Sequence, residues 1–251
     1  MIIAIDIGNT TATFGFFTDD SLIFKFSLPS SPRVTPEKCW SKFQGFLDPD
    51  MQITGAICSS VSPDMTRVVK SFADKYLKTS FKLLKVTDDI GITNRYKNPE
   101  QLGADRIINA LAAKKIYSLP AIIIDLGTAI TVDAVGKDSD FLGGVILPGI
   151  GISADALHKK TSLLPKVELL IPQNVLGKST IAAIQSGLTY GFSGMLRFLV
   201  EKIKEESGFE TSEVILTGGH TGVMESLLAD IVTTVDPNLT LKGLNYAFPL
   251  I

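Results

Sequence analysis

An internal repeat constrains the fold of this chain more than any other feature of its sequence. The segment at residues 3–13, IAIDIGNTTAT, returns at residues 122–131 as IIIDLGTAIT, one residue shorter. Each copy has the pattern of a buried strand that ends in Asp-x-Gly, followed by small hydroxyl residues and a second strand. The repeat therefore predicts two halves of similar plan, each opened by the same strand, turn and strand.

The segments that follow the two copies predict the same order of elements, βββαβα, twice. The helix expected at residues 104–117 joins the halves, so the boundary is predicted near Ser118, with one domain at 1–118 and another at 119–251. The fold class is therefore α/β. The elements expected after the first copy are a strand at 22–28, a helix at 36–46, a strand ending at 60 and a helix at 63–77; those after the second are a strand at 141–147, helices at 152–158 and 180–206, a strand at 214–217 and a helix after 219.

Composition excludes several classes of function. Lysine and arginine number 24 against 26 acidic residues, a net charge of −2, and nucleic-acid surfaces need an excess of basic side chains. No signal-peptide pattern and no apolar run long enough to span a bilayer is found, so we expect no membrane segment. Cys39 and Cys58 fit no zinc or disulfide spacing, which favours a cytoplasmic protein.

The turn in each copy has the composition of a phosphate-binding hairpin. Glycine after a buried strand allows a tight turn and brings main-chain N–H groups close to a phosphate, and Asp6 could contact a hydrated magnesium ion. A single Asp-x-Gly turn could equally be an ordinary hairpin. Two copies, each opening a half, favour a nucleotide held by a hairpin from each. Other nucleotide motifs fail, because Pro172 stands where a P-loop needs glycine and no βαβ unit follows the GxGxxA string at 149–154.

A second candidate site is the string Gly103-Ala104-Asp105-Arg106. An apolar stripe after it predicts a helix, which places Asp105 and Arg106 in the first turn. Asp105 could act as a general base toward a substrate hydroxyl, with Arg106 holding an anionic group. An acidic residue that only stabilises a helix start, beside a solvated arginine, is the open alternative.

These motifs, in this order and spacing, resemble the type III pantothenate kinases of the actin, sugar-kinase and heat-shock-chaperone ATPase superfamily. The two Asp-x-Gly turns resemble the family's phosphate motifs, and residues 103–106 match its GxDR signature with Tyr96 upstream. Residues 143–149 match its GGxIxPG segment. Residues 216–219 resemble its adenosine-side turn, and residues 177–187 resemble a further family segment, which here contains Thr180.

The resemblance implies a fold of two tandem actin-like, or ribonuclease H-like, βββαβα domains with an ATP cleft between them. It implies transfer of the γ-phosphoryl group of ATP to the 4′-hydroxyl of pantothenate, the first step of coenzyme A biosynthesis, with Asp105 as the proton acceptor. It further implies Mg²⁺, a K⁺ or NH₄⁺ ion at Asp125, and a homodimer. The residues implied for pantothenate are Tyr96, Gly103, Ala104, Asp105, Arg106 and Thr180, and those for ATP are Asp6, Ile7, Gly8, Asn9, Thr10, Thr11, Ala12, Thr13 and Thr128.

Two alternatives stay open at this stage. One is a kinase for another small hydroxylated metabolite, although a chain of 251 residues leaves little room for the sugar-binding insertion of the longer sugar kinases. The other is a catalytically silent homologue that binds a nucleotide or metabolite and acts as a regulator. Retention of Asp6, Asp105, Asp125 and Thr128 argues against a silent homologue.

Overall fold

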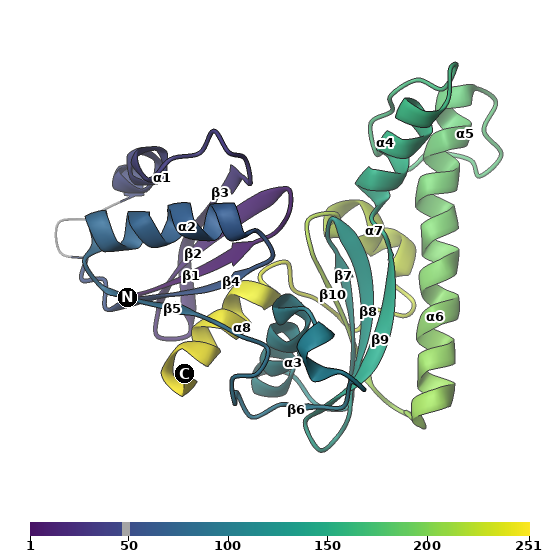
Figure 1. Cartoon of the computed structure of the whole chain (residues 1–251). Coiled ribbons are helices and arrows are strands. Elements are labelled where there is room, and N and C mark those ends of the chain that lie inside the picture. Colours follow the sequence, from purple (N-terminus) through teal and green to yellow (C-terminus); the bar gives the residue numbers. More distant parts are fainter. Residues whose placement is uncertain (47–50) are drawn as a thin grey trace. The chain divides into compact units, whose positions relative to one another are not determined.

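The computed structural model describes residues 1–46 and 51–251, which form two compact units (Figure 1). Unit 1 comprises Met1–Ile116 and Leu239–Ile251, and unit 2 comprises Tyr117–Asn238. In the part of the chain that the structure describes, no helix is both long and apolar enough to cross a membrane.

Unit 1 is built on a five-stranded sheet in the order β3-β2-β1-β4-β5. β1 pairs with β2 in antiparallel and with β4 in parallel orientation. The strands are β1 (Ile2–Ile7), β2 (Thr11–Thr18), β3 (Ser21–Pro29), β4 (Gly55–Ser60) and β5 (Ser80–Leu83), with a further short strand β6 (Thr93–Asn94); the helices are α1 (Pro36–Phe43), η1 (Gln44–Phe46), α2 (Pro63–Phe72), η2 (Ala73–Leu77), η3 (Pro99–Gln101), α3 (Ala104–Ile116), α8 (Leu239–Ala247) and η5 (Phe248–Leu250).

The two faces of the unit 1 sheet bury different kinds of side chain. On one face, isoleucines of β1 pack with aromatic residues of β2, α1 and α2, including Phe14, Phe43 and Phe72. The opposite face carries Gly15 and Gly55, where an added Cβ would lie 2.9 Å from Leu241 and 2.1 Å from the Phe248 ring. Because these positions have no side chain, α8 and η5 approach the sheet closely there.

Unit 2 repeats this plan, with its strands in the order β11-β10-β7-β8-β9. β7 pairs with β8 in antiparallel and with β10 in parallel orientation, as β1 does with β2 and β4. In Figure 1, α6 runs along this sheet, and its apolar face packs on it through Leu196 and Val200. The elements are β7 (Ala121–Leu126), β8 (Ala129–Val135), β9 (Asp140–Pro148), α4 (Ile150–Lys160), α5 (Thr180–Ser186), η4 (Gly187–Gly191), α6 (Phe192–Ser207), β10 (Glu213–Thr217), α7 (Thr221–Leu228) and β11 (Thr234–Val235).

The structure confirms the predicted α/β class and the duplicated plan, and adds elements that the sequence analysis missed. The strands β5 and β11 are short and lie at sheet edges, so they show too little alternation of apolar and polar residues to be recognised. The domain boundary also differs. The division falls after Ile116, and Leu239–Ile251 belong to unit 1, not to the domain predicted at 119–251.

Contacts of α8 explain why the C-terminal segment belongs to unit 1. Thr240 Oγ1 donates a hydrogen bond to Asn109 Oδ1 at 2.8 Å, and Lys82 Nζ donates to the Phe248 carbonyl oxygen at 2.9 Å. A Cβ added to Gly243 would lie 2.4 Å from the Ile108 carbonyl oxygen, so the backbones of α3 and α8 touch at this glycine. Local sequence cannot reveal a contact between residues so far apart in the chain.

We expect Gly243→Ala to destabilise the protein by about 1–3 kcal/mol, because the new methyl group must push α8 away from α3. Gly194→Ala is the matched control, since Gly194 lies in α6 with nothing within 4 Å of an added Cβ. There the helix preference of alanine predicts a gain of up to about 1 kcal/mol. Thermal unfolding measures both, and equal stabilities for the two variants would contradict the close contact.

Candidate active site

The first Asp-x-Gly turn forms a tight hairpin between β1 and β2. The Gly8 N–H donates to the Thr11 carbonyl oxygen at 2.9 Å, which closes the turn. Ser30 supports it from the segment after β3, because its hydroxyl donates to the Gly8 carbonyl oxygen at 2.7 Å. Asn9, Thr10 and Thr11 are exposed at the tip. The hairpin is therefore a loop held in shape by hydrogen bonds, with its polar side chains exposed.

Asp6, at the end of β1, carries a carboxyl group that the fold partly buries. Burial raises the pKa of this carboxyl from 3.8 to about 6, the negative charge of Asp105 adds to the rise, and a hydrogen bond from Ser59 opposes it. Ser59 lies opposite Asp6 on β4, and its Oγ donates to Asp6 Oδ1 at 2.7 Å. Neither Ser59 nor Asp105 supplies a positive charge to balance the Asp6 carboxylate. A bound cation would balance it, so Asp6 is a suitable cation ligand.

The string at residues 103–106 begins α3 and brings Asp105, Arg106 and Tyr96 together. The Arg106 main-chain N–H donates to Asp105 Oδ1 at 2.9 Å. A Cβ added to Gly103 would lie 2.4 Å from the same oxygen, so a side chain at this position would push the carboxylate out of its present place. The Arg106 side chain is buried, donates to the Tyr96 hydroxyl at 2.7 Å and lies over the Tyr96 ring at 5.4 Å. Arg106 is thus a held cation, not a solvated one.

A small pocket in unit 1 joins these two groups of residues. It opens at the carboxyl ends of β1 and β4 and at the start of α3. Ligands of α/β proteins commonly bind at the carboxyl ends of parallel strands. The lining residues are Asp6, Ile7, Gly8, Ser59, Ser60, Val61, Ala104 and Asp105. The structure therefore places the predicted base beside the first predicted phosphate hairpin.

The second hairpin, in unit 2, is tightly packed from two sides. The Gly149 N–H donates to the Thr128 carbonyl oxygen at 3.1 Å, and a Cβ on Gly149 would lie 2.2 Å from that oxygen. Gly218, with a φ of +97°, lies so close to Asp125 that an added Cβ would be 2.5 Å from Asp125 Oδ1. These contacts give a physical reason for two glycines in the segments 143–149 and 216–219.

Asp125 offers oxygen donors of a kind that cations bind. Two oxygens lie near Gly127. A Cβ added to this glycine would be 3.4 Å from Asp125 Oδ1 and 3.2 Å from the Ala129 carbonyl oxygen. Across residues 1–46 and 51–251, no three His, Cys, Asp or Glu side chains gather as an all-protein metal site. Any cation at Asp6 or Asp125 would therefore need ligands beyond such side chains, for example hydroxyl or main-chain oxygens, water or phosphate.

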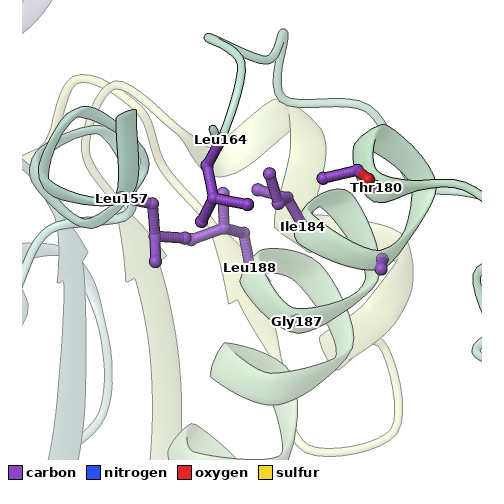
Figure 2. A pocket seen from close by; sticks show the side chains of 7 residues that line it. Leu157, Leu164, Thr180, Ile184, Gly187 and Leu188 are labelled. Carbon is purple, nitrogen blue, oxygen red and sulfur yellow. The ribbon is translucent and has the colours of Figure 1, made fainter. Parts of the chain in front are cut away.

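Thr180, a further predicted site residue, belongs to unit 2. It is exposed at the first residue of α5, where the Ser179 hydroxyl accepts a hydrogen bond from the Ala182 N–H and caps the helix. Figure 2 shows Thr180 at one end of an apolar pocket, where the side chains of Leu157, Leu164 and Ile184 point toward one another. Thr180 therefore belongs to unit 2, whereas the other residues predicted for pantothenate, Tyr96 and Gly103 to Arg106, belong to unit 1.

Sequence reasoning missed four residues of the first site, Ser30, Ser59, Ser60 and Val61. Ser59 is the residue before the last of β4, a buried strand that is parallel to β1, and Ser30 lies in the Ser/Pro-rich segment after β3. A hydroxyl residue at the carboxyl end of a predicted parallel strand was the available signal for Ser59. Ser30 gave none, since its contact with the hairpin depends on the path of the chain after β3.

Comparison with solved structures identifies the fold. A crystal structure of the inorganic polyphosphate/ATP-glucomannokinase from Arthrobacter sp. strain KM matches with a TM-score of 0.53 at 15% identity, over 99% of this chain and 98% of that one. The fold is therefore the one shared by actin-like ATPases and sugar kinases, as predicted.

Comparison with known sequences identifies the family. The family model described as type III pantothenate kinase matches residues 2–202. A type III pantothenate kinase of Finegoldia magna is 38% identical, covering 97% of this chain and 95% of the relative; one of Desulfosudis oleivorans is 39% identical, covering 97% of each. The chain belongs to the type III pantothenate kinase family.

We expect Asp6→Asn to stabilise the ligand-free protein at neutral pH. The folded state raises the pKa of this carboxyl to about 6, so its contribution to stability is present below the unfolded pKa of 3.8 and is lost as the pH rises through 6. The neutral amide avoids that loss, and it can still accept the Ser59 hydrogen bond. The gain is at most about 3 kcal/mol, from about two pKa units.

Thermal unfolding in a metal chelator, across about pH 4 to pH 8, measures this effect. The wild-type protein at the lowest pH is the internal control, because its Asp6 is then largely protonated. The melting temperatures of variant and wild type converge there and separate as the pH rises. A difference that is constant with pH would contradict the raised pKa.

Proposed function

We propose that this protein transfers the γ-phosphoryl group of ATP to the 4′-hydroxyl of pantothenate and so catalyses the first step of coenzyme A biosynthesis. Membership of the type III pantothenate kinase family supports this substrate. The observation that carries the proposal is the pocket in which Asp105 lies beside Asp6 and the first phosphate hairpin. Because its substrate ATP is abundant in the cytoplasm, we place the reaction there.

In the proposed mechanism, Asp105 is the general base. Its carboxylate accepts the proton of the 4′-hydroxyl while that oxygen attacks the γ-phosphorus. The new phosphorus–oxygen bond forms as the bond to the β,γ-bridging oxygen breaks, and ADP leaves with that oxygen. Positioning and charge neutralisation dominate phosphoryl transfer, so the base needs correct placement more than unusual strength. The hydrogen bond from the Arg106 N–H to Asp105 Oδ1 and the space at Gly103 supply that placement.

ATP is held, in this proposal, by the two hairpins. Their N–H groups and hydroxyls would bind the phosphate oxygens, because tight glycine turns present such donors without a side chain in the way. The hydrogen bonds from Ser30 to Gly8 and from Gly149 to Thr128 hold the hairpins in shape before ATP arrives. The residues proposed for ATP are Asp6, Ile7, Gly8, Asn9, Thr10, Thr11, Ala12, Thr13 and Thr128.

We propose two cation positions, each fitted by the donors present. Asp6 would hold Mg²⁺ through water, because magnesium prefers one or two carboxylates and completes its shell with water and phosphate oxygens. Asp125, at the turn that also carries the Ala129 carbonyl oxygen, would hold a monovalent K⁺ or NH₄⁺ ion. These ions would neutralise negative charge on the phosphates as the γ-phosphoryl group moves.

Pantothenate recognition would rest on Arg106 and Tyr96. Pantothenate carries a carboxylate, and a buried guanidinium held by a tyrosine hydroxyl is a preorganised partner for a carboxylate. Gly103 and Ala104 would contact the substrate through the backbone at the start of α3. Thr180 would add a hydroxyl contact.

We expect Asp105→Asn to lower kcat by about 10²- to 10⁴-fold, because the amide cannot accept the proton. Release of ADP that depends on pantothenate measures the rate, with potassium compared with sodium in the same assay. Glu100→Gln is the control, since Glu100 is an exposed acid in the same segment that lines no part of the pocket.

Three outcomes separate the possibilities. A full rate in the Asp105→Asn variant would contradict the base assignment, and equal rates in sodium and potassium would contradict the monovalent site. A wild-type protein that binds ATP but releases no ADP with pantothenate would contradict the proposed reaction. That last result would favour a silent homologue or a kinase for another metabolite.

We also propose that the chain forms a homodimer through unit 2. Large apolar side chains are exposed around α4 and α5, and Leu163 and Leu176 are 91% and 79% exposed. Apolar surface gathered in this way marks a contact with another protein. Sedimentation equilibrium is expected to give twice the chain mass, and Leu176→Glu to shift it toward the monomer. A monomeric wild-type protein at micromolar concentration would contradict the proposal.

A further inference from the structure

Ser59 is a buried hydroxyl residue that touches the candidate site and has no role in the mechanism above. It is 1% exposed, at the carboxyl end of β4. Its position opposite Asp6 follows from the parallel register of β1 and β4. Residues paired in register point to the same face of a sheet, so the two side chains meet. The Oγ donates to Asp6 Oδ1 at 2.7 Å, a short bond of the kind that charged acceptors make.

The second unit repeats this juxtaposition at its own hairpin. Asp125 of β7 pairs in register with Thr217 of β10, as Asp6 pairs with Ser59. On the antiparallel side Asp125 pairs with Thr131, as Asp6 pairs with Thr13. In both units, therefore, the hairpin aspartate stands in a row between two hydroxyl residues. In both halves the parallel partner strand places a hydroxyl residue beside the hairpin aspartate, Ser59 in unit 1 and Thr217 in unit 2.

The geometry gives Ser59 a defined effect on Asp6. A carboxylate on a short side chain can rotate about χ2, and that torsion has broad wells. A hydrogen bond from a buried partner to Oδ1 selects one orientation and directs Oδ2 away from β4. Ser60 and Val61 continue the same pocket wall, and Asp105 faces it from α3. Ser59 thus determines which part of the carboxylate a bound ion can reach.

We propose that Ser59 is a positioning residue for Asp6, and that it orients this carboxylate toward the magnesium ion that accompanies ATP. The proposal rests on the function proposed above, because it assigns Asp6 to Mg²⁺. Partners that orient a metal ligand affect metal affinity strongly, and their removal costs about 10- to 100-fold. The alternative is that Ser59 only satisfies a buried carboxylate and stabilises the fold.

Calorimetric binding of ADP, with Mg²⁺ and separately with a chelator, tests the proposal without relying on activity. We expect Ser59→Ala to weaken ADP binding in Mg²⁺ by about tenfold and to leave binding in the chelator unchanged. Ser59→Thr keeps the donor and is expected to restore binding in Mg²⁺. Ser59→Cys has a similar volume and a weak S–H donor, so its ADP affinity in Mg²⁺ is expected to lie between those of the alanine and threonine variants. It replaces the alanine variant if that protein does not fold.

The matched control is Thr54→Ala, which removes a hydroxyl just before β4, at the end of that strand remote from Asp6, where it donates to the Met1 carbonyl oxygen. This variant is expected to bind ADP as the wild type does under both conditions. A folded alanine or cysteine variant with wild-type binding in Mg²⁺ would overturn the proposal. So would equal losses in Mg²⁺ and in the chelator, which a purely structural role produces.

Failure of the proposed function would give a different result. A wild-type protein that binds ADP in a magnesium-dependent way, loses that dependence in Ser59→Ala, yet never phosphorylates pantothenate would retain the role of Ser59. Only the assignment of pantothenate as the substrate would then be wrong.

Discussion

The register in which β1 pairs with its two neighbours is the constraint on which the first site depends. Alternation along β1 sends Ile3, Ile5 and Ile7 into the core beneath α1 and α2, so Asp6 must point to the opposite face. There the parallel partner supplies Ser59, and the start of α3 supplies Asp105. A slip of one residue would bury the carboxylate among phenylalanines, which is energetically prohibitive. The hydrophobic core therefore enforces the position of the acid.

Close approach of backbones is the second requirement, and glycines meet it at specific places. Gly149 lets the start of α4 touch the second hairpin. Gly243 lets α8 contact α3, whose first turn carries Asp105 and Arg106. The C-terminal helix thus supports the element that holds the proposed base, although it is more than a hundred residues away in sequence. At each contact, the absence of a side chain allows the two main-chain segments to lie against each other.

Much of the fold and of the site could be predicted from local pattern. The repeat of Asp6 and Asp125 predicted two similar units, and the glycine and hydroxyl composition predicted the hairpins; the matching strand orders of the two sheets confirm the duplicated plan. The short edge strands β5 and β11 and the helix α8 were missed, because few residues with weak periodicity give no clear signal. Arg106 could be read as solvated or held, and only the contact with Tyr96 decides that it is held.

The sequence by itself determined the family, the duplicated strand and turn units, and the residue types that phosphoryl transfer needs. These depend on local order and spacing along the chain. The tertiary structure alone decided that Ser59 contacts Asp6, that Asp105 lies in the same pocket, and that Leu239–Ile251 complete unit 1. The reason is physical: strand register and helix docking are set by which surfaces bury each other. Contacts between distant segments leave no periodic trace in either segment alone.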